Sequence, residues 1–273
     1  MSGLVTINID NYIADVRLNR PDKYNALSPE MFQAIIEAGE TLKGDSSIRV
    51  VVLSGNGKGF CAGLDFSSFQ QMGSGGEEGE SQGSRSLFER PAGTPANFAQ
   101  YTGFVWKEMA VPVIAAVHGV AFGGGLQIAL GADIRLASPD ARFSVMEIKW
   151  GLVPDMSGTQ TLRDLVRLDV AKELTFTGRQ VPAEEAAKLG LVTRVCDDPL
   201  KEAMEMAAVI AGKSPDAIAS DKQLLETAWR ASAEEGLKLE ESLQKALISS
   251  PNQVEAVMAN FENRPPNFKD RSN

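Results

Sequence analysis

Runs of consecutive apolar residues alternate with segments of helical spacing through the first two-thirds of the chain, and this alternation limits the possible folds most. Residues 50–53 and 111–117 have almost only apolar side chains, which is typical of strands buried on both faces of a parallel sheet. Residues 134–136 and 141–143 have the pattern of shorter strands. Strands that alternate with helices along a chain indicate the α/β class.

The N-terminal residues predict a hairpin followed by a helix. Apolar side chains alternate over residues 5–9 and again over 13–18, on either side of a turn at residues 10–11. Residues 28–30 (Ser-Pro-Glu) then supply a capping hydroxyl, a proline suited to the first helical position and an acid for the first turn. The helix is expected to end near Gly44.

The sequence pattern changes at about residue 197, which predicts two parts. A mixed α/β core is expected over residues 1–197 and a helical C-terminal region over residues 198–273. The expected C-terminal helices are 198–212, 215–230, 233–248 and 251–261. Five glycines among the thirteen residues 72–84 predict a mobile surface loop, or a loop that closes over a ligand.

Charge and cysteine content exclude several classes of protein. The chain has 273 residues, and its 27 Lys and Arg against 36 Asp and Glu give a net charge of −9. Nucleic acids and anionic membranes both attract basic surfaces, so neither is an expected partner. Two cysteines are too few for a disulfide scaffold, and no run approaches 18 apolar residues. A cytoplasmic location is expected.

The single histidine, His118, restricts the chemistry further. A histidine-rich metal site is impossible, and any Ser-His-Asp or Cys-His mechanism would have to use this one residue. No metal site is expected. Because His118 follows residues 114–117 in an expected strand, we predict a core histidine with satisfied ring nitrogens.

Two glycine-rich segments follow expected strands. Residues 55–60 resemble a dinucleotide fingerprint but have Phe60 where the third glycine is needed, so a dehydrogenase is disfavoured. Residues 123–125 are three glycines before an apolar helix expected to begin near Leu126. Bare N–H groups at a helix N-terminus suit an anion, or an oxygen that becomes anionic during a reaction. Close packing of helix on strand is the alternative.

Several blocks of the chain resemble the enoyl-CoA hydratase/isomerase (crotonase) superfamily, in the same order and over nearly the whole length. They are residues 19–27 (NRPDKYNAL), 60–65 (FCAGLD), 115–119 (AAVHG), 123–125, 133–137 (DIRLA), 143–147, 151–154 (GLVP), 175–178 (TFTG), 186–192 (AAKLGLV) and 264–266 (RPP). The resemblance implies a spiral of ββα units, with a C-terminal helical region that builds a homotrimer or a dimer of trimers. It also implies an acyl-CoA thioester as substrate, without a further cofactor, and a place in fatty-acid metabolism.

The resemblance also implies how the thioester is bound. Its oxygen would lie between the backbone N–H groups of Leu64 and Gly124. Coenzyme A would lie along Ala62, Gly63, Leu64 and Asp65, and Arg20 and Lys23 are candidates for its phosphates by position. The family tends to have Lys-Arg near the C-terminus where this chain has Asn263-Arg264, so a phosphate contact from there is not expected.

Three further residues are candidates for the chemistry. Glu147 occupies the position of the family's catalytic glutamate, and its apolar neighbours would raise the pKa of a carboxyl group by desolvation. Gln127 stands where hydratases have a second glutamate; an amide can hold water but cannot transfer a proton at neutral pH. Asp155 stands where dienoyl-CoA isomerases have a catalytic aspartate. A surface position for Gln127 and a helix cap for Asp155 are the structural alternatives.

The combination favours an isomerase that moves a double bond in an enoyl- or dienoyl-CoA through an enolate. One base can take a proton and return it elsewhere, whereas efficient hydration needs two titratable groups. Dienoyl-CoA isomerases have an aspartate at position 127, so the pattern matches no subfamily fully. An enoyl-CoA hydratase and a non-catalytic acyl-CoA-binding protein are the alternatives.

Overall fold

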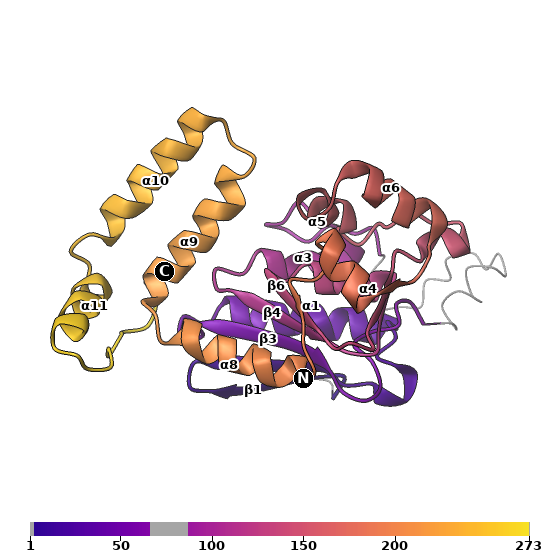
Figure 1. Cartoon of the computed structure of the whole chain (residues 1–273), viewed down its shortest axis with the longest axis horizontal. Coiled ribbons are helices and arrows are strands. Elements are labelled where there is room, and N and C mark those ends of the chain that lie inside the picture. Colours follow the sequence, from indigo (N-terminus) through magenta and orange to yellow (C-terminus); the bar gives the residue numbers. More distant parts are fainter. Residues whose placement is uncertain (1–2, 66–86, 273) are drawn as a thin grey trace.

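The computed structural model describes residues 3–65 and 87–272. Its centre is a six-stranded sheet in the order β1-β2-β3-β4-β6-β9, in which β1 is antiparallel to β2 and the other neighbours are parallel. The strands are β1 (Val5–Asp10), β2 (Ile13–Leu18), β3 (Val50–Gly55), β4 (Val113–Val117), β6 (Ile134–Ala137) and β9 (Arg194–Val195). The α/β class expected from the sequence is confirmed (Figure 1).

A smaller three-stranded sheet lies beside the first and has the order β5-β7-β8. Its strands are β5 (Val120–Phe122), β7 (Arg142–Ser144) and β8 (Val181–Pro182). A bridge between Cys61 and Ala121 joins the segment after β3 to this second sheet. The chain from β3 therefore leaves the large sheet and runs along the small one.

Helices alternate with the strands along the chain, as the α/β class predicts. They are α1 (Pro29–Lys43), α3 (Phe98–Lys107), α4 (Gly124–Leu130), α5 (Gly158–Leu165), α6 (Leu168–Thr177), α7 (Ala183–Leu189), α8 (Pro199–Ala211), α9 (Pro215–Ala228), α10 (Ala233–Leu247) and α11 (Pro251–Phe261), with short 3-10 helices at Pro21–Lys23 and Glu147–Trp150. Helix α1 begins as expected, because the Ser28 hydroxyl accepts from the Met31 N–H and Gly44 ends the helix.

Both faces of the large sheet are covered, which explains the apolar runs in its central strands, at residues 50–53 of β3 and 113–117 of β4. In β3, Val51 and Leu53 join the main core together with residues of α1, α3 and α4. Val50 and Val52 point to the opposite face, where Ala203 and the other small residues of α8 cover them. This two-sided burial is the physical basis of the uninterrupted valine run.

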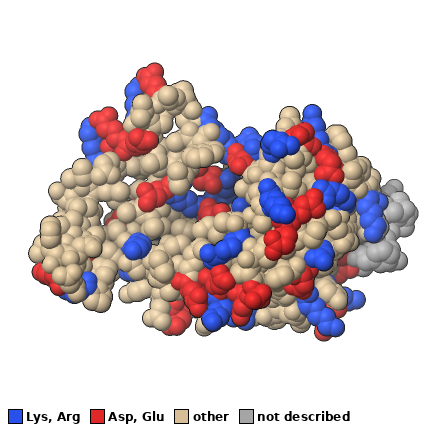
Figure 2. Space-filling model, viewed as in Figure 1, with Lys and Arg blue, Asp and Glu red and all other residues tan. Residues whose placement is uncertain are grey.

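Helices α9, α10 and α11 lie away from the sheets (Figure 1). Large parts of the surface over them are uncharged in Figure 2, whereas charges of both signs mix over the core. Exposed large apolar residues occur on all three helices or at their ends: Leu225, Trp229, Leu237, Ile248, Val254, Val257, Met258 and Phe261. Among the described residues no helix combines the length and the apolar character needed to cross a bilayer.

His118 lies at the end of β4 and not in the core. The prediction that His118 is a core histidine is wrong: β4 ends at Val117, and His118 lies partly exposed after it, with Nε2 3.0 Å from the Gly57 carbonyl oxygen. The strand ends there because the chain turns at Gly119, which has φ +60°. The loop predicted over residues 72–84 lies outside the described residues.

Candidate active site

The segment after β3 lies directly against the first turn of α4. Leu27 and Leu64 form a parallel bridge, in which the Leu27 N–H donates to Gly63 O (2.8 Å) and the Asp65 N–H donates to Leu27 O (3.0 Å). On the other side, the Phe122 N–H donates to Cys61 O (3.0 Å). Backbone hydrogen bonds on both sides thus hold residues 61–65 in an extended path beside the start of the helix.

Two glycines make this close approach possible. Gly63 has φ +86°, and a Cβ atom there would lie 2.6 Å from the Phe122 carbonyl oxygen. A Cβ atom on Gly125 would lie 2.3 Å from the Cys61 carbonyl oxygen. Side chains at these positions would push the segment and the helix apart, so the glycine pattern of the sequence has a steric cause.

The Leu64 and Gly124 N–H groups have no protein acceptor among residues 3–65 and 87–272. The bridge between Leu27 and Leu64 is made by the N–H groups of Leu27 and Asp65, so it does not use the Leu64 N–H. Gly124 is the first residue of α4, and the first N–H groups of a helix have no partner within it. The Gly124 N–H also lies at the positive end of the helix dipole. Two such amides from adjoining segments can together donate hydrogen bonds to a carbonyl oxygen that gains negative charge.

Glu147 begins the 3-10 helix that follows β7, and its side chain is only 8% exposed. Its Oε1 accepts a 2.6 Å hydrogen bond from Gln127 Nε2 and lies next to Gly123. Its Oε2 is buried and, among the described residues, has no hydrogen-bond partner. Burial raises the pKa of Glu147 and outweighs the opposing effects of its own backbone N–H and of the Gln127 amide.

Gln127 lies inside the protein, not on the surface of α4, and is 2% exposed. The alternative of a surface glutamine is therefore wrong. The reason is the packing of α4 in the core, where all seven of its residues are buried.

Asp155 lies in the turn that leads to α5, and its side chain is exposed. Desolvation still raises the pKa of its carboxyl group, because one side of the turn faces the protein. Its negative charge also contributes to the raised pKa of Glu147, so the two carboxyl groups interact through space. The Asp155 side chain has no described bond that would make it a cap of α5, and Ser157 is the residue that precedes that helix.

The expected coenzyme A residues lie on one side of the site. Arg20 Nη1 donates to Asp65 Oδ2 (2.5 Å) and to the Ala26 carbonyl oxygen (2.9 Å), so these two candidates form an ion pair with each other. Lys23 is exposed at the end of a 3-10 helix. Ala62 and Gly63 lie between Asp65 and β3 in the extended segment. Contacts of Arg20 and Lys23 with a phosphate stay predictions.

Asn25 is a supporting residue that the sequence analysis did not single out. It is fully buried with φ +54°, and its Nδ2 donates to the carbonyl oxygens of Asn56, Gly59 and Phe60 at 2.9–3.0 Å. These bonds hold the chain just before the Leu64 amide. The one feature of the sequence that pointed to Asn25 was its place within the NRPDKYNAL block. A single asparagine in a turn does not show to which carbonyl groups its side chain will donate.

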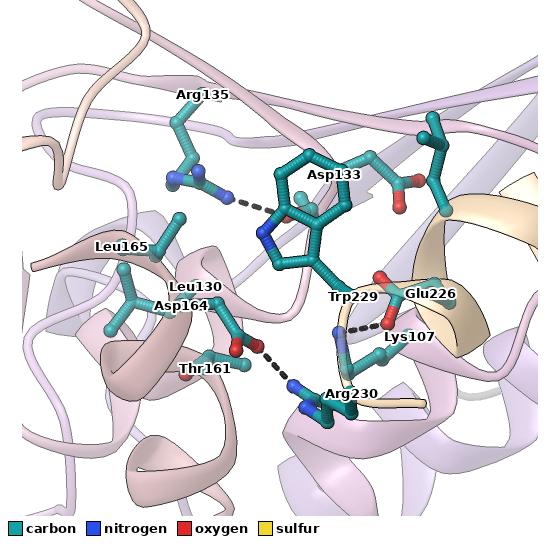
Figure 3. Close-up of a pocket in the computed structure, with 12 residues that line it drawn as sticks. Lys107, Leu130, Asp133, Arg135, Thr161, Asp164, Leu165, Glu226, Trp229 and Arg230 are labelled. Atoms are coloured by element: carbon teal, nitrogen blue, oxygen red, sulfur yellow. Dashed lines mark hydrogen bonds and ion pairs between the residues drawn. The ribbon is translucent and has the colours of Figure 1, made fainter. Parts of the chain in front are cut away.

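A cavity of about 300 Å³ lies at the other end of α4, between the core and α9 (Figure 3). Four of its charged lining residues form two ion pairs, Lys107 with Glu226 and Arg230 with Asp164. Leu130 at the C-terminal end of α4 lines it, whereas Gly124 and Glu147 lie at the opposite end. In the described part of the chain, no cluster of three or more metal-ligating side chains occurs.

A family model described as enoyl-CoA hydratase/isomerase matches residues 8–271. The chain belongs to the enoyl-CoA hydratase/isomerase family. It is 33% identical to a probable mitochondrial enoyl-CoA hydratase 2 of Arabidopsis thaliana, over 94% of this chain and 81% of that protein. It is 32% identical to a peroxisomal Delta(3,5)-Delta(2,4)-dienoyl-CoA isomerase of the same plant, over 97% and 95%.

Solved structures agree with this membership. A putative enoyl-CoA hydratase/isomerase from Mycobacterium abscessus superposes with a TM-score of 0.87 at 28% identity, covering 98% of this chain and all of that one. An enoyl-CoA hydratase from Mycobacterium smegmatis superposes with a TM-score of 0.81 at 32% identity, covering 97% and 98%. The crotonase fold expected from the resemblance, with two sheets and C-terminal helices, is confirmed.

The contact between Gly125 and Cys61 can be tested by substitution. Gly125→Ala places a Cβ atom against a backbone oxygen that cannot move aside, so we expect a loss of stability of about 1–3 kcal/mol, measured by urea denaturation. Gly44→Ala is the control, because its Cβ atom would have no neighbour closer than 3.7 Å. Equal stability of the two variants would contradict the close approach.

Proposed function

We propose that the protein moves a carbon–carbon double bond in an enoyl-CoA or dienoyl-CoA thioester by proton transfer. Glu147 acts as the base, and the Leu64 and Gly124 N–H groups hold the oxygen of the enolate that forms. The observation that carries the proposal is Glu147 Oε2, a buried carboxylate oxygen without a hydrogen-bond partner among the described residues. Such an atom costs folding free energy, and a substrate proton would give it a partner.

The free amides supply what the carboxylate alone lacks. The hydrogen on C2 of a thioester is far less acidic than a carboxylic acid, so Glu147 can remove it only if the growing negative charge on the oxygen is stabilised. Fixed N–H donors do this without reorganising, and losing one typically costs about 2.7–4 kcal/mol of transition-state stabilisation. Burial contributes as well, because it raises the pKa of Glu147 toward the range suited to a general base.

The proton is then returned to a different carbon. For a 3-enoyl-CoA, Glu147 takes the proton from C2, the electron pair shifts through the enolate, and the protonated Glu147 delivers the proton to C4. For a 3,5-dienoyl-CoA the proton must arrive at C6, and Asp155 is the second acid on the accessible side of the turn. In that step Asp155 gives its own proton to C6 and afterwards regains one from the protonated Glu147, and the raised pKa of Asp155 makes its carboxyl group easier to protonate.

Hydration of a 2-enoyl-CoA is the second candidate reaction. Similarity to named relatives supports it as much as it supports isomerisation. Proteins named hydratase and isomerase are equally similar to this chain, at 33% and 32% identity. Gln127 supports isomerisation, because its amide cannot donate or accept a proton in the reaction and both of its ends already bond to the protein.

Product analysis with three substrates distinguishes the candidates. We expect a 3-enoyl-CoA to give the 2-enoyl-CoA and a 3,5-dienoyl-CoA to give the 2,4-dienoyl-CoA, measured by chromatography and by the absorbance of the conjugated thioester. A 2-enoyl-CoA should gain water slowly or not at all. Fast hydration without isomerisation would replace the first proposal by the second. Stoichiometric binding without turnover of any of the three would indicate a non-catalytic acyl-CoA-binding protein.

Glu147→Gln should separate activity from stability. Turnover should fall about 100- to 10,000-fold, the usual contribution of a general base. Burial raises the folded-state pKa above the unfolded one, so Glu147 destabilises the fold increasingly as the pH rises through the folded value. The variant should therefore melt at a higher temperature than the parent at pH 8, with a smaller difference at pH 4.

Glu184→Gln, at an exposed position on α7, is the control and should change neither turnover nor the pH dependence of melting. Unimpaired turnover in Glu147→Gln would remove Glu147 from the mechanism.

We also propose that residues 198–273 act as an assembly region and that the protein is a homotrimer or a dimer of trimers. The exposed apolar residues of α9 to α11, among them Trp229 (73%) and Phe261 (80%), support this, since patches of such residues mark interfaces. Light scattering should give three or six times the mass of the chain. A monomer would contradict the proposal.

A further inference from the structure

Gln127 connects three parts of the site through one buried amide. Its Oε1 accepts hydrogen bonds from the Met156 N–H (2.8 Å) and the Gly158 N–H (2.9 Å), and its Nε2 donates to Glu147 Oε1 (2.6 Å). The orientation of the amide follows from its partners. Backbone N–H groups only donate, so the oxygen must face them, and the nitrogen must then face the carboxylate.

The turn held by these bonds has an unfavourable backbone conformation. Ser157 lies between the two donors with φ +71°, a left-handed value that is uncommon for residues other than glycine. Its hydroxyl is buried and has no partner among the described residues. Such a conformation persists only where neighbouring contacts hold it, and the two bonds to Gln127 flank it. Asp155 directly precedes Met156, so the same bonds restrain its backbone.

We propose that Gln127 is the positioning residue of this site: its amide holds the Glu147 carboxylate in one orientation and fixes the turn that carries Asp155 relative to it. The proposal rests on Glu147 acting as the base. Gln127 itself touches no reacting atom in this proposal, because its amide nitrogen bonds to Glu147 Oε1, and Oε2, which has no hydrogen-bond partner among the described residues, is the atom that takes the proton. The residue at position 127 thereby determines how far apart the two carboxyl groups lie.

A glutamate at the same position would act differently. It could still accept from Met156 and Gly158, but its second oxygen would face Glu147 Oε1 at the distance of a hydrogen bond. Two carboxylates that close share one proton, and the pair then titrates as a unit. The amide keeps Glu147 independent, with Asp155 as the charged group that influences it among the described residues. We infer that glutamine at this position makes Glu147 the sole base.

Two substitutions test the proposal. Gln127→Met keeps the size of the side chain and removes all three bonds, so kcat should fall about 100-fold with little change in KM. The acidic limb of the kcat profile should move to higher pH, because the carboxylate loses a donor. Gln127→Glu keeps the acceptor for the turn, so its melting temperature should stay closer to that of the parent, while its acidic limb also moves to higher pH.

Gln33 offers a matched control. On the exposed face of α1 it also donates to a glutamate, with Nε2 2.8 Å from Glu37 Oε1. Gln33→Met and Gln33→Glu should leave kcat, KM and the acidic limb unchanged. Parental kcat and an unmoved acidic limb in Gln127→Met would overturn the proposal.

A measurement without turnover separates this proposal from the proposed function. At pH 8, Glu147→Gln should raise the melting temperature more in the Gln127→Met background than in the parent, because the unsupported carboxylate destabilises the fold more. Equal increments in the two backgrounds would overturn the positioning role whichever reaction the protein catalyses. Unequal increments in a protein that turns over none of the three thioesters would keep Gln127 as the positioning residue and reject the proposed isomerisation.

Discussion

The close contact between an extended segment and the first turn of α4 is the constraint on which the site depends. Gly63 and Gly125 allow backbone atoms to approach where any side chain would collide with a carbonyl oxygen. The bridge from Leu27 to Leu64 and the bonds from Asn25 hold the segment from its other side. As a result, the N–H groups of Leu64 and Gly124 have no acceptor among the described residues, because the first N–H groups of a helix have no partner within it and the bridge to Leu27 does not use the Leu64 N–H.

The second constraint is the buried carboxylate of Glu147 beside Gly123, at the start of α4. Glu147 is stabilised at one oxygen by Gln127 and left without a described partner at the other. An unsatisfied buried acceptor typically costs about 1–3 kcal/mol, so the arrangement lowers the stability of the fold. A protein can retain such a destabilising group when a bound ligand supplies the missing hydrogen-bond partner. The left-handed Ser157 in the adjoining turn is a further unfavourable feature at the same place.

Much of the fold could be predicted because its signals are local. The hairpin of β1 and β2, the capped start of α1, the buried strands β3 and β4 and the four C-terminal helices follow from alternation, capping residues and apolar runs. His118 was placed wrongly, since the apolar run before it does not show where a strand stops. Gln127 looked like a possible surface residue, because its burial depends on elements about 20 and 30 residues further along the chain.

The sequence by itself determined the class of the fold, the family and the residue types available for chemistry: one histidine, glycines next to strands, a glutamate among apolar neighbours and a glutamine in place of a second acid. Only the tertiary structure decided which of these groups meet. It paired Arg20 with Asp65, placed Gln127 between Glu147 and the turn of Asp155, and left the amides of Leu64 and Gly124 without an acceptor in the part of the chain that the structure describes. The physical reason is that hydrogen-bond partners and burial arise from long-range packing, which the local pattern of a chain does not contain.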